Sequence, residues 1–142
     1  MSLPEKIRTF YFDHKDEYGE RREGNFSVKC RLTMRERQMM ELNKSRLLGG
    51  HSSPTDALMG ISVMVATLIT HITDAPEWWK QSDNGMDLED ETIVIKLFNQ
   101  LTNEQVAWRD ALTKHALDKT AAVEQELDKE ASLPGNGSVE TK

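Results

Sequence analysis

Residues 57–69 read Ala-Leu-Met-Gly-Ile-Ser-Val-Met-Val-Ala-Thr-Leu-Ile, and ten of these thirteen residues are apolar with no charge among them. Just upstream, Ser53 suits a helix N-cap, Pro54 suits the first helical position, and Asp56 places negative charge where the helix dipole is positive. The pattern predicts a helix over about residues 54–73. Apolar side chains take up well over half of its circumference, so we expect a core helix that the rest of the chain covers.

Length and composition narrow the classes of protein that this chain can represent. Thirteen residues are too few to span a bilayer, which needs roughly 20, and the 142 residues suit one domain with tails. The net charge of −6 argues against a nucleic-acid-binding protein. The single cysteine, Cys30, excludes an internal disulfide and a multi-cysteine zinc site. No signal for a secretory leader is visible at the N-terminus, so we expect none.

The N-terminal third has the period-two alternation of β-strands. Residues 25–32 alternate polar and apolar side chains, and residues 8–12 are rich in β-formers, with Phe10 and Phe12 on one face. Between them, residues 13–24 are mostly charged and contain Gly19 and Gly24. We therefore predict a β-hairpin over residues 8–32 with a long, solvated loop, which is either a plain connector or a mobile partner-binding finger.

A second helix is predicted over about residues 34–48. Thr33 and Glu36 have capping-box spacing, and glycines at 49 and 50 end the segment. Its methionines suit either core packing or an adaptable binding groove. Its basic side is either a solvated face or a contact for an acidic partner.

The last predicted helix covers about residues 88–117. It opens with a run of carboxylates at 87–91 and carries an apolar seam to Leu112, although a fresh N-cap near Thr102 is an alternative. Before it, Trp78 and Trp79 are adjacent in a turn and cannot easily both be buried in one place, so one of them either caps the core or marks an interface. Beyond residue 117 the pattern weakens, and helix there would be unpacked.

No catalytic, cofactor-binding or metal site is expected. The four histidines fall in four different predicted elements and form no metal-binding pair, and the carboxylates at 87–91 lack calcium-loop spacing. Cys30 points inward on a strand, and His71 lies near the end of the core helix, so both suit structural roles. The chain has no phosphate-binding glycine loop and no nucleophile elbow.

The predicted fold class is α+β and mainly α, with an N-terminal β-hairpin packed on a bundle of three to four helices. We expect a flexible N-terminus at 1–7, one globular domain at 8–117 and a weakly structured to disordered tail at 118–142. Residues with exposed or adaptable side chains are the candidates for partner binding: Met39, Met40, Trp78, Trp79, Arg35 and Arg46.

Short motifs in a fixed order resemble the siphophage tail assembly chaperones. They are a Gly-x-Phe-x-Val-Lys strand, a Leu-Thr helix start, Gly-Gly after the first helix, and a Pro-x-Trp turn before an acidic helix start. In this sequence they stand at residues 24–29, 32–36, 47–50, 75–79 and 87–91, with Ala-Thr-Leu at 66–68, and the resemblance covers residues 20 to about 110.

The resemblance implies a non-enzymatic phage morphogenesis protein that acts in the host cytoplasm. Such a protein binds the tape-measure protein transiently and keeps it soluble until the tail tube forms, so the tube protein is a further possible partner, as is a second copy of the chain. No nucleic acid or membrane partner is expected. The first alternative is a small structural tail or neck component that is retained in the virion. An enzyme or metal protein and a host-directed regulator are more distant alternatives.

Overall fold

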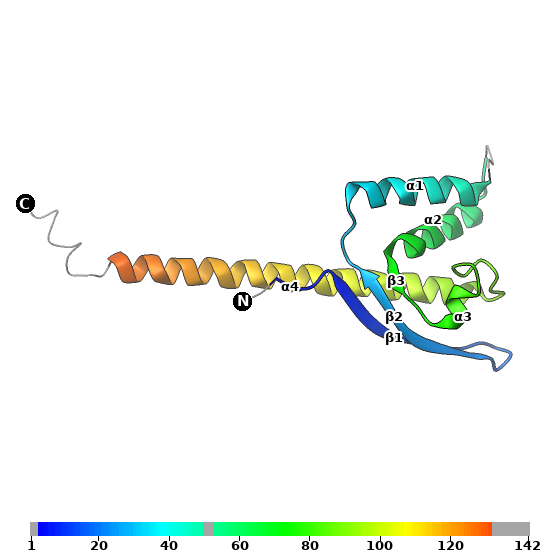
Figure 1. Cartoon of the computed structure of the whole chain (residues 1–142), viewed down its shortest axis with the longest axis horizontal. Coiled ribbons are helices and arrows are strands. Elements are labelled where there is room, and N and C mark those ends of the chain that lie inside the picture. The colour runs from blue at the N-terminus through cyan, green and yellow to red at the C-terminus, as the bar shows by residue number, and fades with distance from the viewer. Residues whose placement is uncertain (1–2, 50–52, 132–142) are drawn as a thin grey trace, which may run out of the picture. The chain divides into compact units, whose positions relative to one another are not determined.

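The computed structural model describes residues 3–49 and 53–131 (Figure 1). The chain divides into two compact units, one of residues Glu5–Val106 and one of Met1–Pro4 with Ala107–Lys142. The elements in chain order are β1 (Ile7–Lys15), β2 (Arg21–Lys29), α1 (Met34–Leu48), α2 (Asp56–His71), β3 (Ile72–Asp74), α3 (Glu77–Lys80) and α4 (Glu91–Ala131). This mainly helical α+β architecture with an N-terminal antiparallel sheet confirms the predicted fold class.

The strands of the N-terminal hairpin extend further toward the turn than predicted, so its loop is shorter, and β2 ends at Lys29 and not at residue 32. β1 and β2 pair from Ile7–Lys29 to Lys15–Arg21, so only residues 16–20 remain as the loop. The prediction of a long solvated loop over 13–24 was wrong because the charged side chains pair across the strands. Arg21 contacts Asp13 at 2.7 Å, for example. The turn itself is closed by Asp16, whose side chain accepts the amides of Tyr18 and Glu20.

A third strand, which directly follows α2 in the chain, joins the sheet. β3 pairs antiparallel with β2, and the strand order is β1-β2-β3. The helix predicted to reach residue 73 therefore ends at His71, because the next residues form ladder bonds with the end of β2. The helix also begins later than expected, at Asp56, because Thr55 and not Ser53 is the N-cap. The Thr55 hydroxyl accepts the amide of Leu58 at 3.1 Å.

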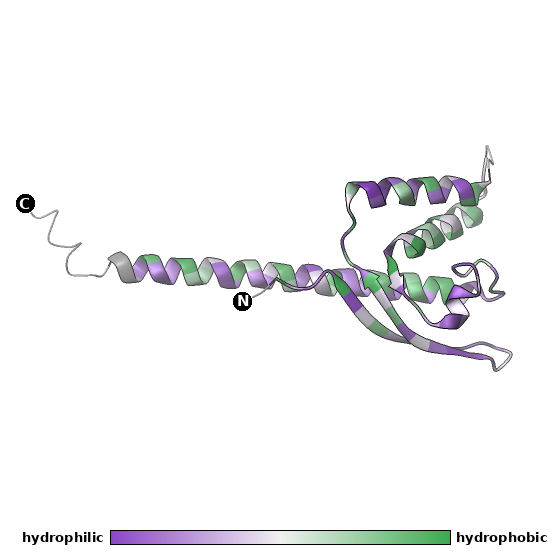
Figure 2. Ribbon diagram, in the orientation of Figure 1, coloured by the Kyte–Doolittle hydropathy of each residue, from purple (hydrophilic) through white to green (hydrophobic). Residues whose placement is uncertain are grey.

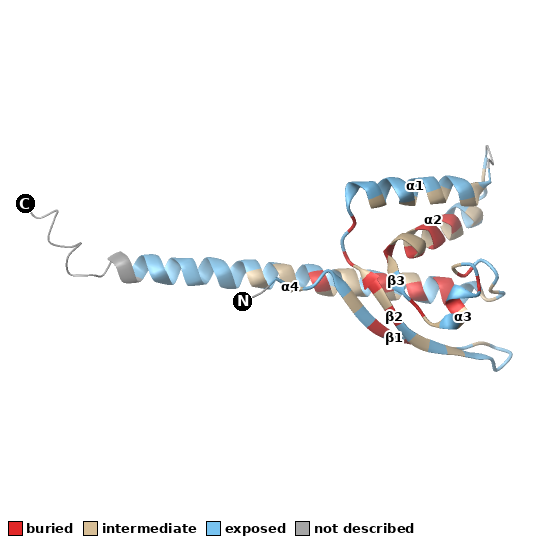
Figure 3. Cartoon of the chain, viewed as in Figure 1, coloured by how far each residue is buried: buried red, intermediate tan, exposed pale blue. Residues whose placement is uncertain are grey.

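The core of the first unit lies between the sheet, α2 and the first turns of α4. One face of the sheet contributes phenylalanines, and α2 contributes Val65 and Leu68. The buried positions concentrate on these elements, while α1 is exposed along its outer side (Figure 3). α2 is thus the core helix that the sequence predicts, although its buried residues all lie between Ser62 and His71. The core members are Phe10, Phe12, Phe26, Val28, Val65, Leu68, Ala75, Trp79, Ile93, Val94, Leu97 and Leu101.

Both ends of α1 follow the predicted capping chemistry. The Thr33 side chain accepts the Glu36 amide at 3.2 Å, and the Glu36 carboxylate accepts the Thr33 amide at 3.0 Å, which completes the capping box. Gly49 closes the other end in the left-handed conformation, with φ of 63°. α1 packs on α2, on the side away from the sheet (Figure 1). No residue of α1 is fully buried.

α4 is one uninterrupted helix, so the alternative of a break near Thr102 is wrong. It begins at Glu91 and not at about residue 88, because the Asp90 carboxylate accepts the Thr92 amide at 2.9 Å and so caps the helix. It continues past the predicted end near 117 to Ala131. The predicted weakly structured to disordered tail at 118–142 is therefore helical over 118–131, and its remainder, 132–142, lies outside the described residues.

Candidate partner-binding surface

The two adjacent tryptophans both pack into the hydrophobic core of the first unit. Trp79 is buried, with its ring edge-on to Phe26 at 5.8 Å between centroids, so it is unavailable to a partner. Trp78 is half-buried, packs against Phe12 and Phe26, and donates its indole N–H to the Glu23 carbonyl at 2.9 Å. The two rings meet edge to face at 6.2 Å, and only Trp79 is fully buried, while Trp78 is half-buried.

The outer side of α1 brings together three of the residues that the sequence singles out. Arg35, Met39 and Arg46 are exposed and lie on one stripe of the helix together with Leu42, since the spacings of four, three and four residues keep side chains on one face. Met39 is 50% exposed and Leu42 63%. We call these four residues the α1 stripe. Met40 is half-buried and lies outside this stripe, on the helix side that carries Leu47.

The Met39 and Leu42 side chains of the α1 stripe are exposed to solvent in the described chain. An exposed pair of this kind, bounded at both ends by arginines, is a candidate protein-binding surface. Figure 2 shows the hydrophobic and hydrophilic residues interleaved along α1. Sequence reasoning missed Leu42, although its spacing of three residues from Met39 is the signal that could have found it.

A hollow of about 560 Å³ lies beside the first turn of α1, at the open end of the hairpin. Four of its side chains are cationic and one is a carboxylate, Glu36, in a protein whose net charge is −6. The exposed apolar residues Ile7 and Met34 also line it. The full lining is Lys6, Ile7, Lys29, Arg31, Leu32, Thr33, Met34, Glu36 and Arg37.

The ion pairs leave this hollow with an excess of positive charge. Lys29 contacts Glu36 at 2.5 Å, and this contact together with the Thr33 amide lowers the pKa of Glu36 to about 2. Within residues 3–49 and 53–131, no ion pair forms at Lys6, Arg31 or Arg37. Unpaired cations beside apolar side chains favour a ligand that carries both carboxylates and apolar groups.

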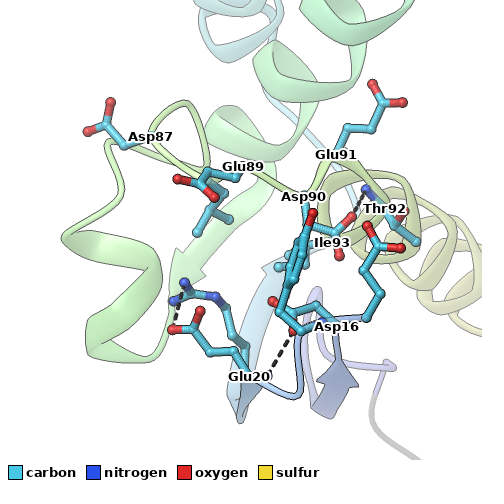
Figure 4. A pocket seen from close by; sticks show the side chains of 12 residues that line it. Asp16, Glu20, Asp87, Glu89, Asp90, Glu91, Thr92 and Ile93 are labelled. Carbon is cyan, nitrogen blue, oxygen red and sulfur yellow. Dashed lines mark hydrogen bonds and ion pairs between the residues drawn. The ribbon is translucent and has the colours of Figure 1, made fainter.

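An acidic hollow of about 650 Å³ lies between the hairpin turn and the start of α4 (Figure 4). Several of its carboxylates already have structural partners. Asp16 closes the turn, and Asp90 caps α4 and contacts the His14 ring at 3.0 Å. The His14 hydrogen bond lowers the pKa of Asp90. Across the part of the chain that the structure describes, no three potential ligands cluster closely enough to hold a metal ion.

Cys30 and His71 occupy structural positions. The buried Cys30 thiol contacts the Glu104 carbonyl at 3.6 Å, and burial raises its pKa. The His71 ring bonds the Thr67 carbonyl at 2.8 Å, and burial lowers its pKa. Neither residue has the exposed, activated environment of a nucleophile or a general base.

Comparison with protein-family models, with curated proteins and with solved structures gives no significant match to this chain. No helix in the described ranges is both long and apolar enough to cross a membrane. The proposal for the function below rests on the exposed side chains of α1 and on the hollow beside it.

Proposed function

We propose that this protein is a non-catalytic binding module, a phage tail assembly chaperone that holds the tape-measure protein through α1. The observation that carries the proposal is the α1 stripe, in which Met39 and Leu42 are exposed between Arg35 and Arg46. The motif resemblance in the sequence supplies the identity of the partner.

The stripe specifies the chemistry of a fitting partner. An amphipathic helix of the partner could pack its apolar side chains on Met39 and Leu42. Helices that bind in this way contact each other through apolar residues three and four positions apart. Methionine adapts to differently shaped partners, which suits a chaperone that binds many segments of one long chain. The two arginines favour carboxylates at the ends of the bound segment, because guanidinium and carboxylate groups form paired hydrogen bonds.

The hollow beside α1 supports the same preference. Lys6, Arg31 and Arg37 surround the exposed Ile7 and Met34, so an acidic residue beside an apolar one would find complementary groups there. Nucleic acid is disfavoured, because the net charge is −6 and the hollow has no aromatic residue for base stacking.

Co-expression with the tape-measure protein, followed by affinity capture, tests the proposal. The variant Met39→Asp/Leu42→Asp should lose at least 90% of capture, because it places charge in the apolar centre of the surface; we take this as roughly a tenfold effect, about 1.4 kcal/mol. Met86→Asp is the matched control, since Met86 is 46% exposed, and it should retain capture.

Two outcomes would refute the proposal. One is equal capture by the Met39→Asp/Leu42→Asp variant and the wild-type chain. The other is the presence of this protein at a fixed copy number in purified particles, since a chaperone leaves the finished tail. That second outcome would support the alternative of a retained structural component. Thermal unfolding of the Met39→Asp/Leu42→Asp chain should match the wild type, because both of its substituted positions lie on the exposed side of α1.

A further inference from the structure

The part of α4 in the second unit presents apolar side chains to solvent. Residues 107–128 are exposed along most of their length (Figure 3), with Val123 48% and Leu127 59% exposed. Trp108 is buried and is therefore not part of this surface. Hydrophobic residues recur among hydrophilic ones along this part of the helix (Figure 2).

Four apolar residues of this segment lie on one stripe of the helix. Leu112, Ala116, Val123 and Leu127 follow one another at intervals of four, seven and four residues, which keeps them on one face; Leu112 is half-buried and the other three are exposed. We call them the α4 stripe. Leu112 and Val123 are eleven residues apart, as are Ala116 and Leu127, and an eleven-residue interval keeps a stripe aligned along helices that pair with a slight right-handed twist.

The intervals between the residues of the α4 stripe are the same in either direction along the helix. In an antiparallel pair of identical helices, the intervals of four, seven and four place Leu112 opposite Leu127 of the second copy, and Ala116 opposite Val123. Both helices would then bury the whole stripe at once. The stripe spans sixteen residues, about 24 Å of helix.

The charges of the segment are also complementary in this orientation. Residues 107–119 carry three cations and two carboxylates, while residues 120–128 carry three carboxylates and no cation. Antiparallel pairing brings the cationic half of one helix beside the acidic half of the other. Parallel pairing would instead place the two acidic halves together, which costs free energy.

We propose that the α4 stripe binds the same stripe of a second copy of this chain in an antiparallel helix pair. A second copy fits this surface because the spacing of the stripe and the net charges of its two halves are self-complementary, while Lys119 at the edge of the stripe would lie near Lys119 of the second copy and weaken the pair. The contact is short, so the dimer is weak and depends on concentration. This dimer does not rest on the proposed function, because it uses no residue of α1.

Sedimentation equilibrium of the full chain, from about 1 μM to 1 mM, tests the dimer. The variant Val123→Glu/Leu127→Glu should raise the dissociation constant at least tenfold, because it puts four carboxylates into the paired stripe. The matched control is Ala121→Glu/Gln125→Glu, which adds the same charge to the opposite side of the same helix and should dimerise like the wild type. The wild type, the α4 variant and the control should give the same unfolding transition for the globular unit.

Disulfide trapping tests the orientation. A mixture of the Leu112→Cys and Leu127→Cys chains should form cross-linked heterodimers, and each variant alone should cross-link little; the native Cys30 is buried and provides the background. Cross-linking of each variant with itself would overturn the antiparallel arrangement. A monomer at every concentration, or a dimer that survives Val123→Glu/Leu127→Glu, would overturn the proposal. A dimer that the Met39→Asp/Leu42→Asp variant abolishes would assign dimerisation to α1 and likewise overturn it.

Discussion

Replacing Gly85 by alanine should destabilise the globular unit through two separate physical effects. Gly85 has φ of 89°, in the left-handed region that residues with a Cβ atom avoid, and this strain costs roughly 1–2 kcal/mol. A Cβ atom at this position would also lie 2.7 Å from Cη2 and 2.8 Å from Cζ3 of Trp79. The Trp79 ring is buried against Phe26 and cannot retreat, so overpacking adds about 1–3 kcal/mol.

The two effects together predict a loss of about 2–5 kcal/mol in the free energy of unfolding. A domain of this size has a stability of about 5–15 kcal/mol, so the change is a large fraction of the total. Because 1 kcal/mol shifts the melting temperature of such a domain by roughly 4–8 °C, the melting temperature should fall by at least about 8 °C. Urea denaturation followed by tryptophan fluorescence measures the change, because Trp79 itself reports on the core.

Gly19→Ala separates strain from overpacking. Gly19 has nearly the same φ, 85°, but a Cβ atom there would meet nothing within 4 Å. Its substitution should therefore cost only the backbone strain of roughly 1–2 kcal/mol. Equal destabilisation by the two substitutions would refute the close packing of Trp79 on Gly85, and an unaffected Gly85→Ala chain would refute the left-handed turn as well.

Four further predictions concern the core, two titrating groups and the thiol. Leu68→Asp buries an unpaired carboxylate and should lower the free energy of unfolding by about 4 kcal/mol or more in urea titration; wild-type stability would contradict the core position of α2. The pKa of Glu36 is lowered from 4.5 to about 2, so its stabilisation is present above pH 4.5 and is lost as pH falls toward 2. Glu36→Gln should therefore flatten the stability profile in that window, and an unchanged profile would count against the Lys29 contact. Burial lowers the pKa of His71 below 6.5, so the unfolded chain binds this proton first and stability should fall as pH drops below 6.5; His71→Gln should remove that part of the pH dependence, measured by thermal unfolding. The buried Cys30 thiol, whose pKa is raised, should react with a thiol reagent only as fast as the chain opens; immediate stoichiometric reaction would contradict its burial.

The local elements of this fold follow from short-range chemistry. The alternation at residues 25–32 predicted the inward side chains Phe26 and Val28, and both are buried. Thr33 and Gly49 predicted both ends of α1, because a hydroxyl at an N-cap and a glycine after the last turn satisfy helix ends from within a few residues. The apolar run at residues 57–69 predicted α2, because the spacing of its side chains is also a local property of the sequence.

The proposed partner-binding surface was only partly predictable. Arg35, Met39 and Arg46 were singled out from composition, and the structure places them on one exposed stripe. Trp79 was singled out on the same grounds and is buried. Composition cannot distinguish the two cases, because whether an apolar side chain is covered depends on which distant segment packs over it.

The sequence by itself determined the three main helices, the apolar centre of the hairpin and the direction of their apolar faces, because capping and periodicity act within a few residues. Only the tertiary structure decided that residues 72–74 leave the core helix to pair with β2, that charged residues extend the hairpin, and that Trp78 and Trp79 share one aromatic cluster. Each of these features joins residues that are distant in sequence or opposite in a ladder. Their free energy comes from pairing and burial that no local pattern of residues encodes.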